Sequence, residues 1–193
     1  MPNERVLLVI DMQNGVFATP RLNRAECVGR INQLSAGADV TIFIQHEEGE
    51  MTEGSESWRL LPELHLPTRY LTVKKTACDA FYRTKLEHTL SELGVHALTV
   101  CGCATDYCVD TTIKVAASKG YALTVAADAH TTADRTHVSA QQLIAQHNEV
   151  WAGLSIPGNA ITLKTTQHIL ADWRGSPTAR GEIDPNFSSP ATP

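Results

Sequence analysis

The chain has no cluster of lysine and arginine residues and no apolar stretch long enough to cross a bilayer. Its 193 residues carry a formal net charge of −5, and a negative chain without a basic cluster makes a poor nucleic-acid surface. A membrane-spanning helix needs roughly 18 or more apolar residues in succession, whereas the apolar runs here are short. We therefore expect neither nucleic acid nor a membrane as a partner.

The sequence also lacks the patterns of an exported, disulfide-bonded protein. An acidic residue, Glu4, precedes the first apolar run, and no signal-peptide cleavage pattern follows it. The five cysteines are an odd number and include no C-x-x-C pair, which disfavours both a disulfide framework and thiol redox chemistry. We expect free thiols and a cytoplasmic location.

The composition is that of a globular protein. Hydrophobic residues make up 42% of the chain and charged residues 19%, and this length suits one domain with a sizeable core. We find no internal repeat and no second domain. Residues 1–173 are expected to form the single domain. Residues 174–193 contain four prolines and no apolar periodicity, which predicts a C-terminal tail that is loose or packed on a partner subunit.

Short apolar runs alternate with segments of helical periodicity along the chain. Strands are expected at residues 5–10, 40–44, 70–73, 98–101, 121–126 and 160–163. Helices are expected at residues 22–34, 84–93, 105–117, 137–151 and 166–173. Residues 49–56 read as an acidic loop, and residues 58–64 as a short amphipathic segment. This alternation is typical of an α/β fold in which helices cover both faces of a parallel sheet, a three-layer α-β-α sandwich.

One stretch, residues 98–117, places a cysteine directly after a strand. Gly102 ends the apolar run, and Thr105 and Asp106 have the side chains of helix N-caps. Cys108 would then lie in the first turn of a helix, where unpaired N–H groups and the helix dipole favour a thiolate and can bind an oxyanion. The alternative is that cysteines are small buried hydrophobes, which we favour for Cys101 and Cys103 but leave open for Cys108.

Polar residues follow the other expected strands. In an open parallel sheet, ligands bind beyond the carboxyl ends of the strands, and Asp11, His46, Lys75 and Asp128 all stand at such ends. A carboxylate, a lysine and a cysteine can form one catalytic unit, because the cation stabilises the thiolate and the carboxylate moves a proton.

Each of these residues also has a structural interpretation. Asp11 can cap a turn, Lys75 can be one of two solvated lysines, and Asp128 is favoured as a structural cap. For His46 we favour a substrate contact or a satisfied polar residue over a metal ligand.

Four segments resemble a known family. They are LLVIDMQNG (residues 7–15), KKTACDAFYRTKLEHTL (74–90), VCGCATDYCVDTTIKVAASKGY (100–121) and VAADAHTT (125–132). Together they are similar to the isochorismatase-like cysteine hydrolase superfamily, which includes nicotinamidases, N-carbamoylsarcosine amidases, and ureidoacrylate and biuret amidases. The family lysine lies six positions before a phenylalanine, so the count back from Phe81 selects Lys75 rather than Lys74.

The resemblance implies a six-stranded parallel sheet, a small-molecule substrate, and a homodimer or homotetramer. It implies that Asp11, Lys75 and Cys108 form the catalytic triad. It further implies a non-proline cis peptide between Cys103 and Ala104, and an oxyanion hole made by the N–H groups of Ala104 and Cys108. The expected pocket wall consists of the residues Gln13, Phe17, His46, Trp58 and Phe81.

One departure from the family bears on metal binding. Metal-dependent nicotinamidases carry an Asp-x-His pair after the second strand, whereas this chain has Ile44-Gln45-His46-Glu47 there and its next histidine is His65. A single histidine among acidic neighbours is not a transition-metal site. We therefore expect a metal-free site and no cofactor.

The sequence leaves three functional hypotheses open. The first is hydrolysis of a C–N bond in a small non-peptide amide or carbamoyl compound through a Cys108 thioester. The second is isochorismatase-type hydrolysis of a vinyl ether, for which Asp11 and Lys75 suffice. The third is a non-catalytic binding member of the fold. The acidic loop at residues 47–57 hints at a cationic substrate, although a solvated loop is the favoured interpretation.

Overall fold

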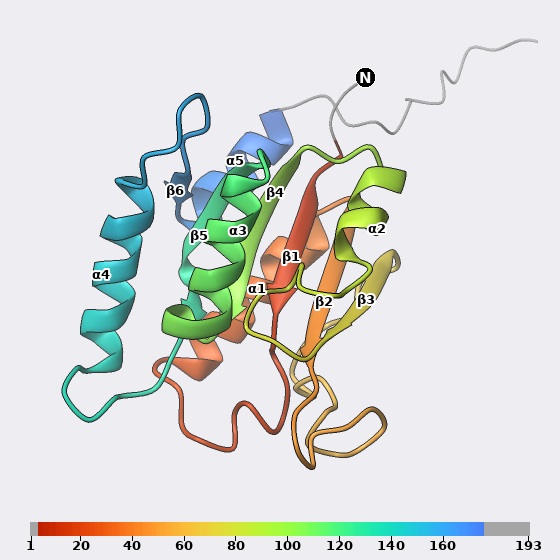
Figure 1. Ribbon diagram of the computed structural model, residues 1–193, viewed down its shortest axis with the longest axis vertical. Helices are drawn as coiled ribbons and strands as arrows, with labels where there is room; N and C mark the ends of the chain where they lie inside the picture. Colours follow the sequence, from red (N-terminus) through yellow and green to blue (C-terminus); the bar gives the residue numbers. More distant parts are fainter. Residues whose placement is uncertain (1–3, 176–193) are drawn as a thin grey trace, which may run out of the picture.

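The computed structural model describes residues 4–175, which form a parallel sheet with helices on both faces (Figure 1). Within these residues the sheet has six strands in the order β3-β2-β1-β4-β5-β6. Their bounds are β1 (Val6–Ile10), β2 (Val40–His46), β3 (Tyr70–Lys75), β4 (Ala97–Cys103), β5 (Ala122–Thr131) and β6 (Thr162–Lys164). All neighbouring strands pair in parallel. The predicted fold class is confirmed.

The helices divide into two layers. Figure 1 shows α2, α3 and α4 on the near face of the sheet and α1 and α5 behind it. Their bounds are α1 (Arg24–Gly37), α2 (Leu86–Glu92), α3 (Asp110–Ser118), α4 (Ala140–Ala152) and α5 (Thr166–Gly175). The strand order reverses between β1 and β4, and a crevice at such a switch point is where open α/β sheets bind ligands.

The central strand β1 explains why the sequence shows continuous apolar runs. All five of its residues are buried, because both faces of the sheet are covered. Leu8 and Ile10 pack into the core beneath α2, α3 and α4, whereas Leu7 and Val9 pack into the core beneath α1 and α5. Strict alternation of polar and apolar residues would have left one of these cores unfilled.

The fifth strand is longer than its sequence predicts. It runs to Thr131, past the expected end at residue 126, after a register shift opposite Val100 and Gly102. Asp128 lies within it, and its Oδ1 atom accepts hydrogen bonds from the backbone N–H and the hydroxyl of Thr166, both at 2.8 Å, at the start of α5. Asp128 is therefore a structural cap, as favoured above, and not part of the site.

The structure bears on three further expectations from the sequence. Residues 58–64 form turns without a helix, because Leu61 and Leu64 are buried individually in the core. None of the helices within residues 4–175 is long and apolar enough to cross a membrane. The expected tail begins at residue 174, but α5 continues to Gly175, and residues 176–193 lie outside the described part of the chain.

Candidate active site

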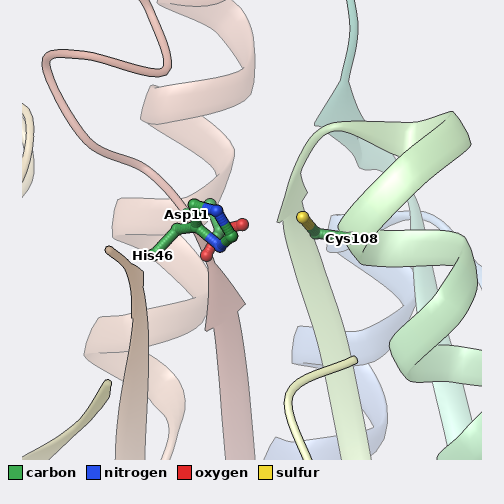
Figure 2. Close-up of side chains that lie close together, drawn as sticks. All are labelled: Asp11, His46 and Cys108. Carbon is green, nitrogen blue, oxygen red and sulfur yellow. The ribbon is translucent and has the colours of Figure 1, made fainter. Parts of the chain in front are cut away.

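Four polar side chains meet beyond the carboxyl ends of the strands. Asp11 follows β1, His46 ends β2 and Lys75 ends β3, where it is the register partner of His46. Cys108 comes from the turn after β4. Figure 2 shows Asp11 and His46 on one side and Cys108 on the other, with its sulfur directed toward them.

Lys75 contacts each of the other three side chains. Its Nζ atom lies 2.7 Å from Asp11 Oδ2, 2.9 Å from His46 Nδ1 and 3.2 Å from Cys108 Sγ. It also donates to the carbonyl oxygen of Ala77 at 3.0 Å. The side chains of Lys75 and Asp11 are 0% and 3% exposed. The structure therefore brings Asp11, Lys75 and Cys108 into one buried contact, while their catalytic roles stay predictions.

Asp11 has a free oxygen within this contact. Its Oδ1 atom is buried and has no hydrogen-bond partner within residues 4–175. The backbone of Asp11 has a φ of 48°, a left-handed conformation that is uncommon for residues other than glycine, and such residues cluster at active sites. The carboxylate and Cys108 Sγ lie within 4.8 Å of each other. Asp11 is thus placed to accept a proton from the thiol.

The local structure around Cys108 differs from the expected helix start. Thr105–Val109 forms one π-helical turn, and α3 begins only at Asp110. Thr105 and Asp106 do not cap the helix, because their side chains have other partners. The Thr105 hydroxyl lies 2.9 Å from His130 Nδ1. The Asp106 carboxylate accepts hydrogen bonds from Arg135 and from a threonine hydroxyl.

The surroundings of Cys108 oppose the thiolate that a helix start alone would favour. Burial raises the pKa of the Cys108 thiol, and the negative charge of Asp11 raises it further, while the Lys75 ammonium acts in the opposite direction. Burial likewise raises the pKa of Asp11 against the opposing charge of Lys75. Burial lowers the pKa of Lys75, but the charges of Asp11 and Cys108 outweigh it and raise that pKa. The resting thiol is therefore protonated at neutral pH.

A cavity of about 520 Å³ opens over this contact. Its lining comes from residues 11–21, 46–51, 76–78 and 104–108 and from Arg135. The lining residues are Asp11, Gly15, Val16, Arg21, His46, Glu48, Met51, Thr76, Ala77, Cys78, Ala104, Tyr107, Cys108 and Arg135. Both expected oxyanion-hole residues, Ala104 and Cys108, are among them. The peptide bond between Cys103 and Ala104 is cis.

Of the five residues expected in the pocket wall, His46 lines the cavity and the others do not. Gln13 is fully buried and bonds the backbone N–H and carbonyl of His46, at 2.7 and 3.1 Å. Its amide also donates to the carbonyl of Trp58 at 2.9 Å, so it holds two loops behind the cavity. Phe17 is buried in the core beside α1. Phe81 stacks on Tyr121 in the opposite core, with ring centroids 5.7 Å apart.

Sequence reasoning missed most of the cavity wall. Arg21, Met51 and Arg135 come from loops without periodicity, so their positions give no signal. Tyr107 and Cys78 could have been predicted, because each lies in a sequence segment that contains a residue of the expected triad. Tyr107 is 53% exposed next to Cys108.

Asp11, His46 and Cys108 are also residue types that can bind a metal ion, and one donor atom from each lies within 4.8 Å of the others. The Lys75 ammonium, however, lies within 3.2 Å of all three side chains. A metal ion bound by the same three atoms would have to displace this buried cation. The arrangement supports the expectation of a metal-free site, which stays a prediction.

An open parallel sheet with a polar cavity at its switch point is typical of a small-molecule site. Comparison with known proteins assigns the chain to a family. Residues 5–151 match the isochorismatase domain. The chain belongs to the isochorismatase family.

Individual relatives agree with this assignment. Streptothricin hydrolase of Streptomyces noursei is 32% identical over 140 residues, which cover 67% of this chain and 55% of that protein. An uncharacterized isochorismatase family protein of Bacillus subtilis is 29% identical over 183 residues, 85% of this chain and 97% of its own length. A crystal structure of an isochorismatase family protein is 34% identical with a TM-score of 0.76, covering 83% of this chain and 98% of that one. The chain thus spans about half the length of streptothricin hydrolase.

Proposed function

We propose that the protein is a metal-independent cysteine hydrolase that cleaves a C–N bond of a small non-peptide amide or carbamoyl compound. The observation that carries this proposal is the contact of Lys75 Nζ with both the Asp11 carboxylate and Cys108 Sγ at the floor of the cavity. A nucleophile, a proton acceptor and a fixed cation within hydrogen-bond reach are the parts of covalent hydrolysis. The family and the name of the streptothricin hydrolase relative support a hydrolytic reaction.

The mechanism begins from a protonated thiol. As Cys108 Sγ attacks the carbonyl carbon of the substrate, its proton passes to Asp11, whose Oδ1 atom has no partner within residues 4–175. Lys75 stays protonated and stabilises both the carboxylate and the developing thiolate. The N–H groups of Ala104 and Cys108 hold the oxyanion, and loss of one such donor typically costs about 10²–10³ in rate.

Collapse of this intermediate breaks the C–N bond. Asp11 returns its proton to the departing nitrogen, which leaves as ammonia or an amine, and the acyl group remains on Cys108 as a thioester. Asp11 then takes a proton from water, whose oxygen attacks the thioester carbonyl. The acid product leaves, and the thiol of Cys108 is restored with the proton held by Asp11.

The test is ammonia release from a panel of small amides, ureas and carbamoyl compounds, with and without a chelator. Cys108→Ala should abolish turnover with little change in Tm, while Cys27→Ala, which removes a buried thiol from α1, should retain it. A thioester on Cys108 should be trapped and seen by mass spectrometry. Turnover retained by Cys108→Ala would rule out the thioester, and loss of turnover with chelator would rule out metal independence.

A vinyl-ether hydrolase is the second candidate, because burial raises the pKa of Asp11, and a protonated carboxyl can protonate an enol carbon. This reaction needs no nucleophilic thiol. Hydrolysis of isochorismate that survives Cys108→Ala but not Asp11→Asn would favour it over the amide reaction.

A further inference from the structure

Two carboxylate side chains, Asp11 and Glu48, and two guanidinium side chains, Arg21 and Arg135, line the cavity. Asp11 is paired with Lys75 at 2.7 Å, and Arg135 is paired with Asp106 at 2.8 Å. Arg21 lines the same cavity and has no carboxylate partner within residues 4–175. Its guanidinium therefore lines the cavity as a positive charge without an ion-pair partner in this part of the chain.

Arg21 also has unused hydrogen-bond donors. Its Nε and Nη2 atoms both donate to the carbonyl oxygen of Val16, at 3.0 and 2.6 Å. A guanidinium has five N–H donors, so three of them meet no acceptor within the described residues. Arg135 uses Nε and Nη2 on Asp106 and Thr132, which leaves its two Nη1 donors without an acceptor in the same part of the chain.

The two arginines come from adjoining segments. The N–H of Leu22 donates to the carbonyl of Thr132 at 3.0 Å, and the Thr131 hydroxyl donates to the carbonyl of Leu22 at 2.6 Å. Arg21 and Arg135 therefore stand on one side of the cavity. The guanidinium of Arg135 is further fixed by the ring of Tyr107, 4.8 Å away. Donors fixed in this way lose little entropy when they bind a ligand.

Part of the acidic loop at residues 47–57 is neutralised by its own ion pairs. Glu53 pairs with Lys74 at 2.7 Å, and Glu56 pairs with Arg59 at 2.8 Å. Glu48 lies 3.3 Å from His46 and its side chain is 82% exposed, so its charge is largely screened by solvent. Glu53 and Glu56 are therefore paired with bases outside the cavity, and Glu48 is the loop carboxylate that lines it.

We propose that Arg21, with Arg135 beside it, forms a subsite for a carboxylate of the substrate. The proposal rests on the proposed function and narrows it: the substrates are small amides or carbamoyl compounds that carry a carboxylate apart from the scissile C–N bond. A planar guanidinium matches a carboxylate with two parallel N–H···O bonds. The carboxylate binds at the arginines while the amide carbonyl lies at Cys108.

Matched substrates test this subsite. Malonamate, succinamate and glutaramate each carry a carboxylate, and propionamide, butyramide and pentanamide replace it with a methyl group at the same length. For the acid that fits best, kcat/KM should exceed that of its neutral partner by about 10- to 100-fold, the range of a charge-assisted hydrogen bond. Arg21→Gln keeps a donor for Val16 but loses the charge, so it should remove most of this preference, measured as the ratio of kcat/KM for each acid to that of its neutral partner. Arg21→Lys should restore part of it.

Binding measurements test this subsite independently of the catalytic reaction. Calorimetry with the same acids and amides on Cys108→Ala measures affinity without turnover, and the preference for an acid should again fall in Cys108→Ala/Arg21→Gln. Arg59→Met removes an exposed arginine outside the cavity and should leave the preference intact. Equal binding of every acid and its neutral partner, or a preference that survives Arg21→Gln, would overturn the subsite. A preference in binding without hydrolysis of any compound would instead overturn the proposed function alone.

Discussion

Removal of the Lys75 ammonium tests whether the buried ion pair is as isolated from water as its contacts indicate. In Lys75→Met, a chain of similar length fills the space, but the Asp11 carboxylate loses its cation while it stays 3% exposed. Its Oδ1 atom already has no partner within residues 4–175. Breaking a buried pair from one side typically costs about 3–5 kcal/mol, because the other charge is left uncompensated.

The pH dependence sharpens this expectation. The lone carboxyl can escape the penalty by taking up a proton, which costs about 1.4 kcal/mol for each pH unit above its ordinary pKa of 3.8. At pH 7 this limits the penalty to about 4.4 kcal/mol, and at pH 6 to about 3.0 kcal/mol. In the variant the folded state binds a proton that the unfolded state releases. Its stability therefore falls as pH rises, at about 1.4 kcal/mol per pH unit.

Denaturant unfolding of wild type and variant at pH 6 and pH 7 measures both quantities. Asp11→Asn/Lys75→Met is the matched control, because it removes both charges and should recover most of the loss. Two results would refute the reasoning: a penalty that does not change with pH, or a double variant as unstable as Lys75→Met.

Two other perturbations follow from buried groups near the site. Burial lowers the pKa of His130 to about 4, so the unfolded state binds this proton first, and as pH falls from 6.5 to 4 the protein should lose about 3 kcal/mol of stability. Unfolding measured across this range should show a smaller loss for His130→Gln, and an equal loss would contradict the assignment. Gly102 has a φ of 122°, and a Cβ there would collide with the main chain of Ile10. Gly102→Ala should therefore lose more than about 3 kcal/mol in thermal unfolding or fail to fold, whereas Gly29→Ala, which meets nothing within 4 Å, should be as stable as wild type or more so; a stable Gly102→Ala would contradict the close approach.

The features that the sequence predicts well depend on local or topological rules. Strands such as β1 are continuous apolar runs because both faces of the sheet are covered. Asp11, Lys75 and Cys108 could be brought together in advance because parallel strands present their carboxyl ends at one edge.

The features that the sequence predicts poorly depend on which partner a side chain finds in the folded chain. Thr105 and Asp106 have the chemistry of helix caps, but His130 and Arg135 bind them instead. Phe81 has the character of a pocket wall, yet Tyr121 provides it with a stacking partner in the core. The hydrogen-bond partners of Thr105 and Asp106 are 25 and 29 residues away, and no local sequence pattern indicates them.

The protonated state of Cys108 follows from the same competition. A helix start alone would favour the thiolate, but burial and the Asp11 carboxylate both raise the thiol pKa, and together they outweigh Lys75. Loss of the thiol proton is then favourable only if Asp11 receives it, because the two negative charges would otherwise share one buried site. Attack on a carbonyl moves negative charge from sulfur toward the substrate oxygen, away from Asp11. In the proposed mechanism the thiol therefore stays protonated until a substrate carbonyl lies beside it, and nucleophilic attack and proton transfer occur in a single step.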